Sequence, residues 1–201
     1  MKKTVLAIAA SGSVLLCALA LTGCSAPSAG TTTGGSGSHA SRVQFYDSIP
    51  DLAADSTAVV VATVGDQREA NDITKDTDFT LSDVTVVEAP KPDQATQPGT
   101  TITVRQFGSK EQPPVATLLE PGRTYLLYLT ATGLDGELGS QYYVTGSSAG
   151  LYESDEPSVS RRAAASDAAT FTKVPALEAE AEPDGEADSL PNQVVLSDAI
   201  D

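Results

Sequence analysis

Cysteine, histidine and tryptophan are scarce in this chain, and their scarcity excludes several kinds of site. Among 201 residues there are two cysteines, one histidine and no tryptophan. Both cysteines, Cys17 and Cys24, precede residue 25, so the rest of the chain has no disulfide framework, thiolate metal site or cysteine nucleophile. His39 lies in a stretch of glycine, serine and threonine, which indicates a solvated linker residue and not a metal ligand.

The same scarcity argues against an enzyme. A serine nucleophile needs a neighbouring base, and no histidine follows residue 39. A lysine base is disfavoured because the four candidates lie in predicted loops, where a lysine keeps its charge: Lys75, Lys91, Lys110 and Lys173. Glycoside cleavage favours aromatic platforms, but the strand tyrosines indicate core and cross-strand packing: Tyr125, Tyr128, Tyr142 and Tyr143. We therefore expect no catalytic residue and no cofactor.

Basic residues are also few, and the formal net charge is −15. Such a surface repels phosphate backbones and anionic lipid headgroups, so nucleic acid is not an expected partner. The simplest interpretation of the charge is solubility in an exposed compartment.

The first 23 residues have the pattern of a secretory signal peptide. Lys2 and Lys3 precede an almost wholly apolar run from Val5 to Leu19, which is too short for a comfortable membrane span. The next residues, Leu21-Thr22-Gly23-Cys24, resemble the lipobox of bacterial lipoproteins. This resemblance implies that Cys24 is acylated and becomes the first mature residue, which would anchor the protein on the extracytoplasmic face of the cell membrane.

Residues 24–42 are rich in serine, glycine and threonine and predict a flexible tether. A tether of this length spans on the order of 20–25 Å, so the folded part would lie close to the membrane.

Residues 43–155 predict one folded domain that is mainly β. Ser48, Pro50 and Asp51 are typical of a helix start, which predicts a short helix over 48–55. Runs of β-branched and alternating apolar residues between turn signals predict strands at 58–64, 79–88, 100–107, 125–129, 141–145 and 151–153. Strands at this spacing favour a small barrel or a sandwich.

The order of these segments is also familiar. The run Val59-Val60-Val61-Ala62-Thr63-Val64, the Gly99–Gly108 strand and the Leu119–Leu129 turn and strand resemble a group of uncharacterised secreted and lipid-anchored bacterial domains, common in actinobacteria. Those domains resemble OB-like or TIMP-like (metalloproteinase-inhibitor-like) barrels. The resemblance implies a five- to six-stranded OB-like barrel with a short N-terminal helix, and it carries no catalytic residue.

Acidic side chains in the loop 66–78 raise the question of a metal. Asp72, Asp76 and Asp78, with Asp66 and Asn71, could offer oxygen ligands to Ca²⁺. The glycine and the terminal glutamate of an EF-hand loop are missing, so an acidic solvated loop without a metal is the favoured interpretation.

The last segment, 156–201, includes an acidic stretch with alanine, proline and glycine and predicts a mostly flexible tail. The sequence as a whole favours a non-enzymatic envelope lipoprotein that binds another envelope component, with an envelope protein as the expected partner. Three alternatives stay open: a Ca²⁺-dependent binding domain, a protease-inhibitor-like domain, and a structural lipoprotein of a membrane complex.

Overall fold

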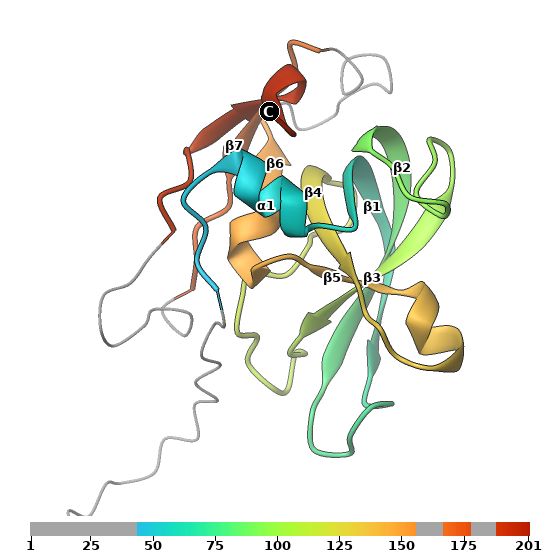
Figure 1. The fold of residues 1–201 in the computed structure, drawn as a ribbon. Coiled ribbons are helices and arrows are strands. Elements are labelled where there is room, and N and C mark those ends of the chain that lie inside the picture. The colour runs from blue at the N-terminus through green and yellow to red at the C-terminus, as the bar shows by residue number, and fades with distance from the viewer. Residues whose placement is uncertain (1–43, 156–166, 178–187) are drawn as a thin grey trace, which may run out of the picture. The chain divides into compact units, whose positions relative to one another are not determined.

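A computed structural model describes residues 44–155, 167–177 and 188–201, and these residues form a mainly β fold (Figure 1). Within them, no helix has the length and apolar character needed to cross a membrane. In chain order the elements are α1 (Ile49–Asp55), β1 (Ala58–Ala70), β2 (Phe79–Lys91), β3 (Thr101–Phe107), β4 (Thr124–Ala131), the 3-10 helix η1 (Gly136–Ser140), β5 (Tyr142–Val144), η2 (Ser147–Gly150), β6 (Leu151–Ser154), β7 (Thr170–Lys173), β8 (Gln193–Val195) and η4 (Leu196–Asp198).

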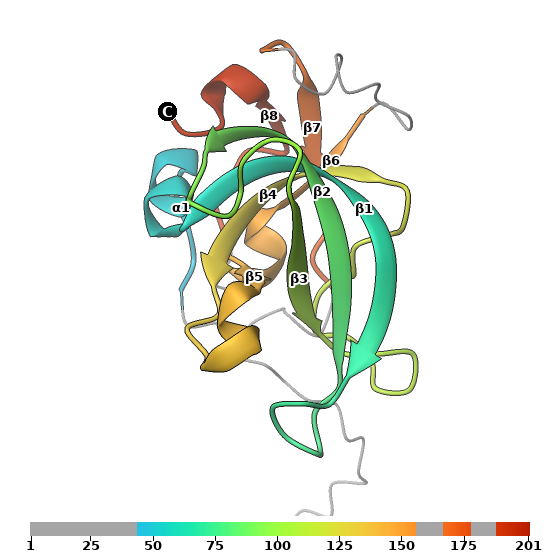
Figure 2. The ribbon, with the colours of Figure 1, turned by 90° about the vertical axis from the view of Figure 1, so that its right-hand side faces the viewer.

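Five strands, β1, β2, β3, β5 and β4, pair in a closed order and form a barrel, and Figure 2 shows how they curve around it. Strand β1 pairs antiparallel with β2, and β2 with β3. Strand β5 then pairs parallel with β3 and antiparallel with β4, and β4 returns to β1. This closed order of strands confirms the predicted OB-like barrel and decides between the barrel and the sandwich.

Residues 58–64 of β1 and 124–129 of β4 are largely buried on both faces, which explains the near-continuous apolar sequence of these parts. One face of each strand points into the barrel, where alternate residues of all five strands pack together. This inner core contains Ala58, Val60, Ala62, Val64, Val84, Val86, Ile102, Val104, Leu119, Tyr125, Leu127, Leu129, Tyr142, Leu151 and Val174.

The opposite faces of β1 and β4 are covered by α1 and by the end of the chain. Together they form a second, outer core with Tyr46, Ile49, Leu52, Ala53, Val59, Val61, Leu126, Tyr128, Ala149, Tyr152, Phe171, Leu190, Val194, Leu196 and Ala199. The Tyr128 hydroxyl donates a hydrogen bond of 2.9 Å to the backbone oxygen of Ala199, which fixes the last turn against β4.

The expectation of a mostly flexible tail over 156–201 is therefore wrong for 167–177 and 188–201. Strand β7 pairs with β6, and β8 pairs with β7, so both extend the sheet. The physical reason is that Val59, Val61 and Leu126 point out of the barrel and need an apolar cover, which Phe171 and Val194 supply. The acidic stretch 178–187 lies outside the described residues.

The predicted helix is confirmed, and both of its ends are held by side chains. The Ser48 hydroxyl accepts a hydrogen bond from the Asp51 backbone N–H, as an N-cap residue does. At the other end, the Lys91 ammonium donates to the backbone oxygens of Ala53 and Ser56, at 2.6 and 2.7 Å. Lys91 thus adds hydrogen bonds to two carbonyls at the helix C-terminus and ties α1 to the end of β2.

Strands β1 and β2 extend well beyond their predicted ends. Strand β1 continues past Gly65 through an irregularity in its register with β2, so the 66–78 loop is shorter than expected. Strand β2 continues to Lys91 although Pro90 lies within it. Beyond Val86 the register with β3 has ended and β1 is the remaining partner strand, so a proline without an N–H is tolerated there.

Candidate binding surface

The outer face of β2, β3 and β5 carries the most distinctive group of side chains. On β3, Ile102 and Val104 point into the barrel, so Thr103, Arg105 and Phe107 point outward. Opposite Arg105 in the strand register lie Leu81 of β2 and Tyr143 of β5. This face lies away from the outer core that α1 and the C-terminal strands build.

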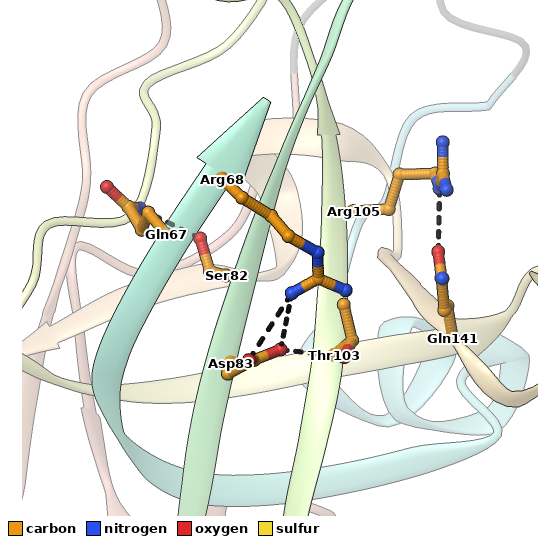
Figure 3. Close-up of polar contacts among 7 residues, drawn as sticks. All are labelled: Gln67, Arg68, Ser82, Asp83, Thr103, Arg105 and Gln141. Atoms are coloured by element: carbon orange, nitrogen blue, oxygen red, sulfur yellow. Dashed lines mark hydrogen bonds and ion pairs between the residues drawn. The ribbon is translucent and has the colours of Figure 1, made fainter. Parts of the chain in front are cut away.

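Arg105 lies at the centre of this face and is fully buried, with 0% of its surface exposed. Its Nη1 and Nη2 atoms donate to the two carboxylate oxygens of Asp72, at 2.6 and 2.8 Å. Its Nε donates to Oε1 of Gln141 at 2.8 Å (Figure 3). All three guanidinium nitrogens thus have a partner, which is the condition under which a buried charge is tolerated.

These contacts connect three parts of the chain. Asp72 belongs to the loop between β1 and β2, and Gln141 ends the connection from β4 to β5. The Arg105 guanidinium therefore fixes both connections against β3. The Arg105 guanidinium carbon also lies 4.8 Å from the ring centre of Phe79, within the range of a cation–π contact.

Above this buried charge lies a group of three aromatic rings. The centres of Phe79 and Phe107 are 4.7 Å apart, and Phe107 lies 6.0 Å from Tyr143 with the two ring planes within 10° of parallel. Phe79 is buried, Tyr143 is half-buried, and Phe107 is 46% exposed. We call Phe107 and Tyr143 the aromatic surface.

Gly108 ends β3 directly after Phe107 and helps to fix its position. Its φ of +105° is a conformation that favours glycine, and a Cβ here would lie 2.3 Å from the Cα of Pro114. The backbone N–H of Gly108 also donates to the oxygen of Asp78 at 2.9 Å. The end of β3 is therefore held against the start of β2.

A second polar group extends the same face toward β1. Nη1 of Arg68 lies 3.1 and 3.3 Å from the two carboxylate oxygens of Asp83, which also accepts a hydrogen bond from the Thr103 hydroxyl (Figure 3). Both members of this ion pair are well exposed, so it contributes less stability than the buried pair.

The electrostatics of the site follow from the Arg105 contacts. The hydrogen bonds from Arg105 hold the pKa of Asp72 below its usual value, against the opposing effect of partial burial. Burial raises the pKa of the Tyr143 hydroxyl and outweighs the opposing effect of the nearby Arg105 charge, and the Asp72 carboxylate raises this pKa further. Asp72 is thus ionised and Tyr143 neutral at pH 7.

The three aspartates predicted as candidate metal ligands do not form a metal site in the described residues. Asp72 binds Arg105, and the Asp78 carboxylate accepts a hydrogen bond of 2.9 Å from the Ser109 hydroxyl. In the part of the chain that the structure describes, no three acidic, histidine or cysteine side chains gather where they could hold a metal ion, and Asp76 is in no such group. The expected lipidation site, Cys24, and the other predictions for residues 1–43 lie outside the described residues.

The sequence did not single out Arg105, Phe107 or Tyr143. The sequence indicates strand packing for Tyr143 as for the other strand tyrosines; Tyr125, Tyr128 and Tyr142 are buried, whereas Tyr143 is only half-buried. One available signal was the alternation along 102–107, in which an arginine occupies the outward series of a short strand. The partner across the loop, Asp72, cannot be paired with Arg105 from sequence spacing.

Comparisons with protein-family models, with curated proteins and with solved structures find no match to this chain.

Proposed function

We propose that the chain is a non-enzymatic, lipid-anchored module that binds an envelope component on the extracytoplasmic face of the cell membrane. The observation that carries the binding part is the aromatic surface, in which an exposed Phe107 and a parallel Tyr143 lie over a buried, fully paired Arg105. Exposed aromatic side chains on a rigid support lose little conformational entropy on binding.

The place of this surface in the barrel supports the same proposal. Barrels of the OB type bind ligands on the face of strands 2 and 3 and between the loops that join strands 1 to 2 and 4 to 5. Here the aromatic surface lies on β3 and β5, and Arg105 ties the corresponding two connections together. The likeness to other OB barrels is one of fold alone, whereas the exposed rings are a feature of this chain.

Binding is favoured over catalysis by the residue types present. Residues 44–201 contain no cysteine and no histidine, and the strongest carboxylate–cation pair is engaged within the fold. Binding is favoured over a purely structural role by exposed apolar side chains near the site, because Phe107 and Ile73, which follows Asp72, both reach solvent.

The location rests on the signal-like start of the chain and on the Leu21-Thr22-Gly23-Cys24 motif. A diacylglycerol on Cys24 would supply two buried chains, enough for stable attachment without a basic patch. That suits a chain whose net charge is −15 and which would gain nothing from anionic headgroups.

Substitution of the acylated residue tests the location. Cys24→Ala is expected to release the protein into the medium or to leave it unprocessed, as shown by membrane fractionation and intact mass. Wild-type protein serves as the control and is expected in the membrane fraction with the mass of an acylated chain that begins at residue 24. A Cys24→Ala protein that stays on the membrane with the same mass as the wild type would contradict the proposal.

A further inference from the structure

We propose that the aromatic surface is the docking site for a basic, apolar-containing segment of an envelope protein. This inference rests on the proposed binding function and adds the chemistry of the partner. Three observations carry it: the exposure of Phe107, the rigid support beneath it, and the acidic connections that Arg105 joins.

The support beneath the rings makes the surface ready to bind. Phe107 packs on the buried Phe79, which in turn lies over the guanidinium of Arg105. That guanidinium is held by Asp72 from one side and by Gln141 from another. A partner side chain that covers Phe107 would therefore gain contact area without first ordering a mobile ring.

The two connections that Arg105 fixes are both acidic. The connection from β1 to β2, residues 71–78, contains three carboxylates and one basic side chain, and the connection from β4 to β5, residues 132–141, contains two carboxylates and no basic side chain. Asp76, Asp135 and Glu137 are exposed. A basic segment could pair with carboxylates on the two connections that Arg105 joins beneath the rings, and its arginine or lysine side chains could also lie over Phe107 and Tyr143 as cation–π partners.

The same charges disfavour two other classes of ligand. Anionic polymers and phosphate-bearing headgroups would be repelled by the loops and by the net charge of −15. A neutral glycan could stack on the parallel rings, but it would leave the acidic loops unused. We therefore commit to a basic protein segment, and the glycan becomes an outcome of the test.

The test measures binding of synthetic peptides to the purified full chain in a neutral detergent. The probe is a labelled peptide of alternating arginine and leucine, and its comparators replace arginine by glutamine or glutamate, or leucine by serine. The Arg–Leu peptide is expected to bind best, and Phe107→Ser is expected to weaken that binding about tenfold, as loss of a central anchor does. The matched control, Ile200→Ser, removes another apolar residue of similar exposure, 40%, and is expected to leave the affinity unchanged.

A second variant tests the charges independently. Asp135→Lys combined with Glu137→Lys is expected to weaken binding of the Arg–Leu peptide several-fold while the Gln–Leu peptide is unaffected. Thermal unfolding of each variant shows that the fold is intact, which is expected because all the substituted side chains are exposed.

Three results would overturn the inference. The first is equal affinity of wild type and Phe107→Ser for the Arg–Leu peptide, which would show that the peptide is held by unspecific charge attraction and not by Phe107. The second is no binding of the Arg–Leu peptide to the folded wild type. The third is Phe107-dependent binding of a soluble N-acetylglucosamine oligomer in place of the peptide. The second result refutes the partner chemistry alone, because the proposed anchoring is measured separately by the Cys24→Ala fractionation.

Discussion

Arg105 of β3 and Asp72 of the loop after β1 form a two-point ion pair in which the guanidinium is fully buried and the carboxylate is 39% exposed. The pair lies under the aromatic surface and fixes the loop that carries Ile73. Stability and binding are therefore linked at this point, because a change in Asp72 frees both a buried charge and a loop at the edge of the surface.

Removal of Asp72 is expected to destabilise the fold. Asp72→Ala leaves the buried Arg105 guanidinium without its carboxylate. We expect the free energy of unfolding to fall by about 2 kcal/mol. This loss is smaller than that for a fully buried ion pair because Asp72 is partly exposed. The measurement is urea unfolding, with the exposed Asp76→Ala as a control that is expected to change stability by less than about 0.5 kcal/mol. The double variant Asp72→Ala with Arg105→Met is expected to be more stable than Asp72→Ala alone, since it removes the unpaired charge. If the stability lost in Asp72→Ala and in Arg105→Met simply added in the double variant, the ion pair would be contradicted.

The same pair predicts a pH dependence. The pKa of Asp72 is lowered in the folded state from its ordinary value of 3.8, so the unfolded state binds a proton more readily. Asp72 therefore makes its full contribution to the free energy of unfolding at pH values above its ordinary pKa. This contribution is lost as the pH falls through the lower pKa that Asp72 has in the folded state. The stability difference between wild type and Asp72→Asn should be constant at neutral pH and shrink below about pH 4. A difference that stays constant down to pH 2 would contradict this assignment.

The C-terminal strand is expected to contribute to the stability of the barrel. Val194 packs into the outer core, whereas its neighbour Val195 is only half-buried. Val194→Ala should reduce the free energy of unfolding by about 2 kcal/mol, through lost burial and a residual cavity. Val195→Ala is the matched control, with an expected loss of less than half that amount. Equal small losses for both would show that the chain end does not belong to the core in solution.

A hydrogen-bonded carboxylate closes one end of the inner core. Asp93 accepts from the Tyr142 hydroxyl at 2.6 Å and from the backbone N–H groups of Ala95 and Thr96 at 2.8 and 2.9 Å. Burial raises the pKa of Asp93, but these hydrogen bonds outweigh it and hold the pKa below its ordinary value. The free energy of unfolding is expected to fall by about 2 kcal/mol in Asp93→Ala and by about 1 kcal/mol in Tyr142→Phe. In a double-mutant cycle the combined loss should be smaller than the sum, and a coupling energy of zero would contradict the Tyr142–Asp93 bond.

The strands of the barrel could be predicted because each carries its own signal. The β-branched run at Val59–Val64 and the apolar run at Tyr125–Leu129 indicate strands buried on both faces, which is what the two cores require. The short helix could be predicted for a similar reason, since Ser48 and Asp51 act within one turn.

The tail and the binding surface depend on contacts that sequence spacing does not reveal. In the sequence, Phe171 and Val194 are isolated apolar residues with no strand pattern around them. Their role becomes clear only in the fold, where they cover the outward apolar faces of β1 and β4. Asp72 looks like a loop carboxylate until the fold brings it to Arg105, 33 residues away in the chain. Phe107 looks like an ordinary strand residue, and its exposure follows only from its position at the end of β3 on the uncovered face.

The most direct measurement of the central claim is site-specific photocrosslinking in intact cells, with benzoylphenylalanine in place of Phe107 and, as the control, in place of Ile200. We expect a reproducible adduct from position 107 alone, and mass spectrometry should map it to a basic segment of an envelope protein. Identical adducts from both positions, or no adduct from position 107, would contradict the claim that this surface binds a partner.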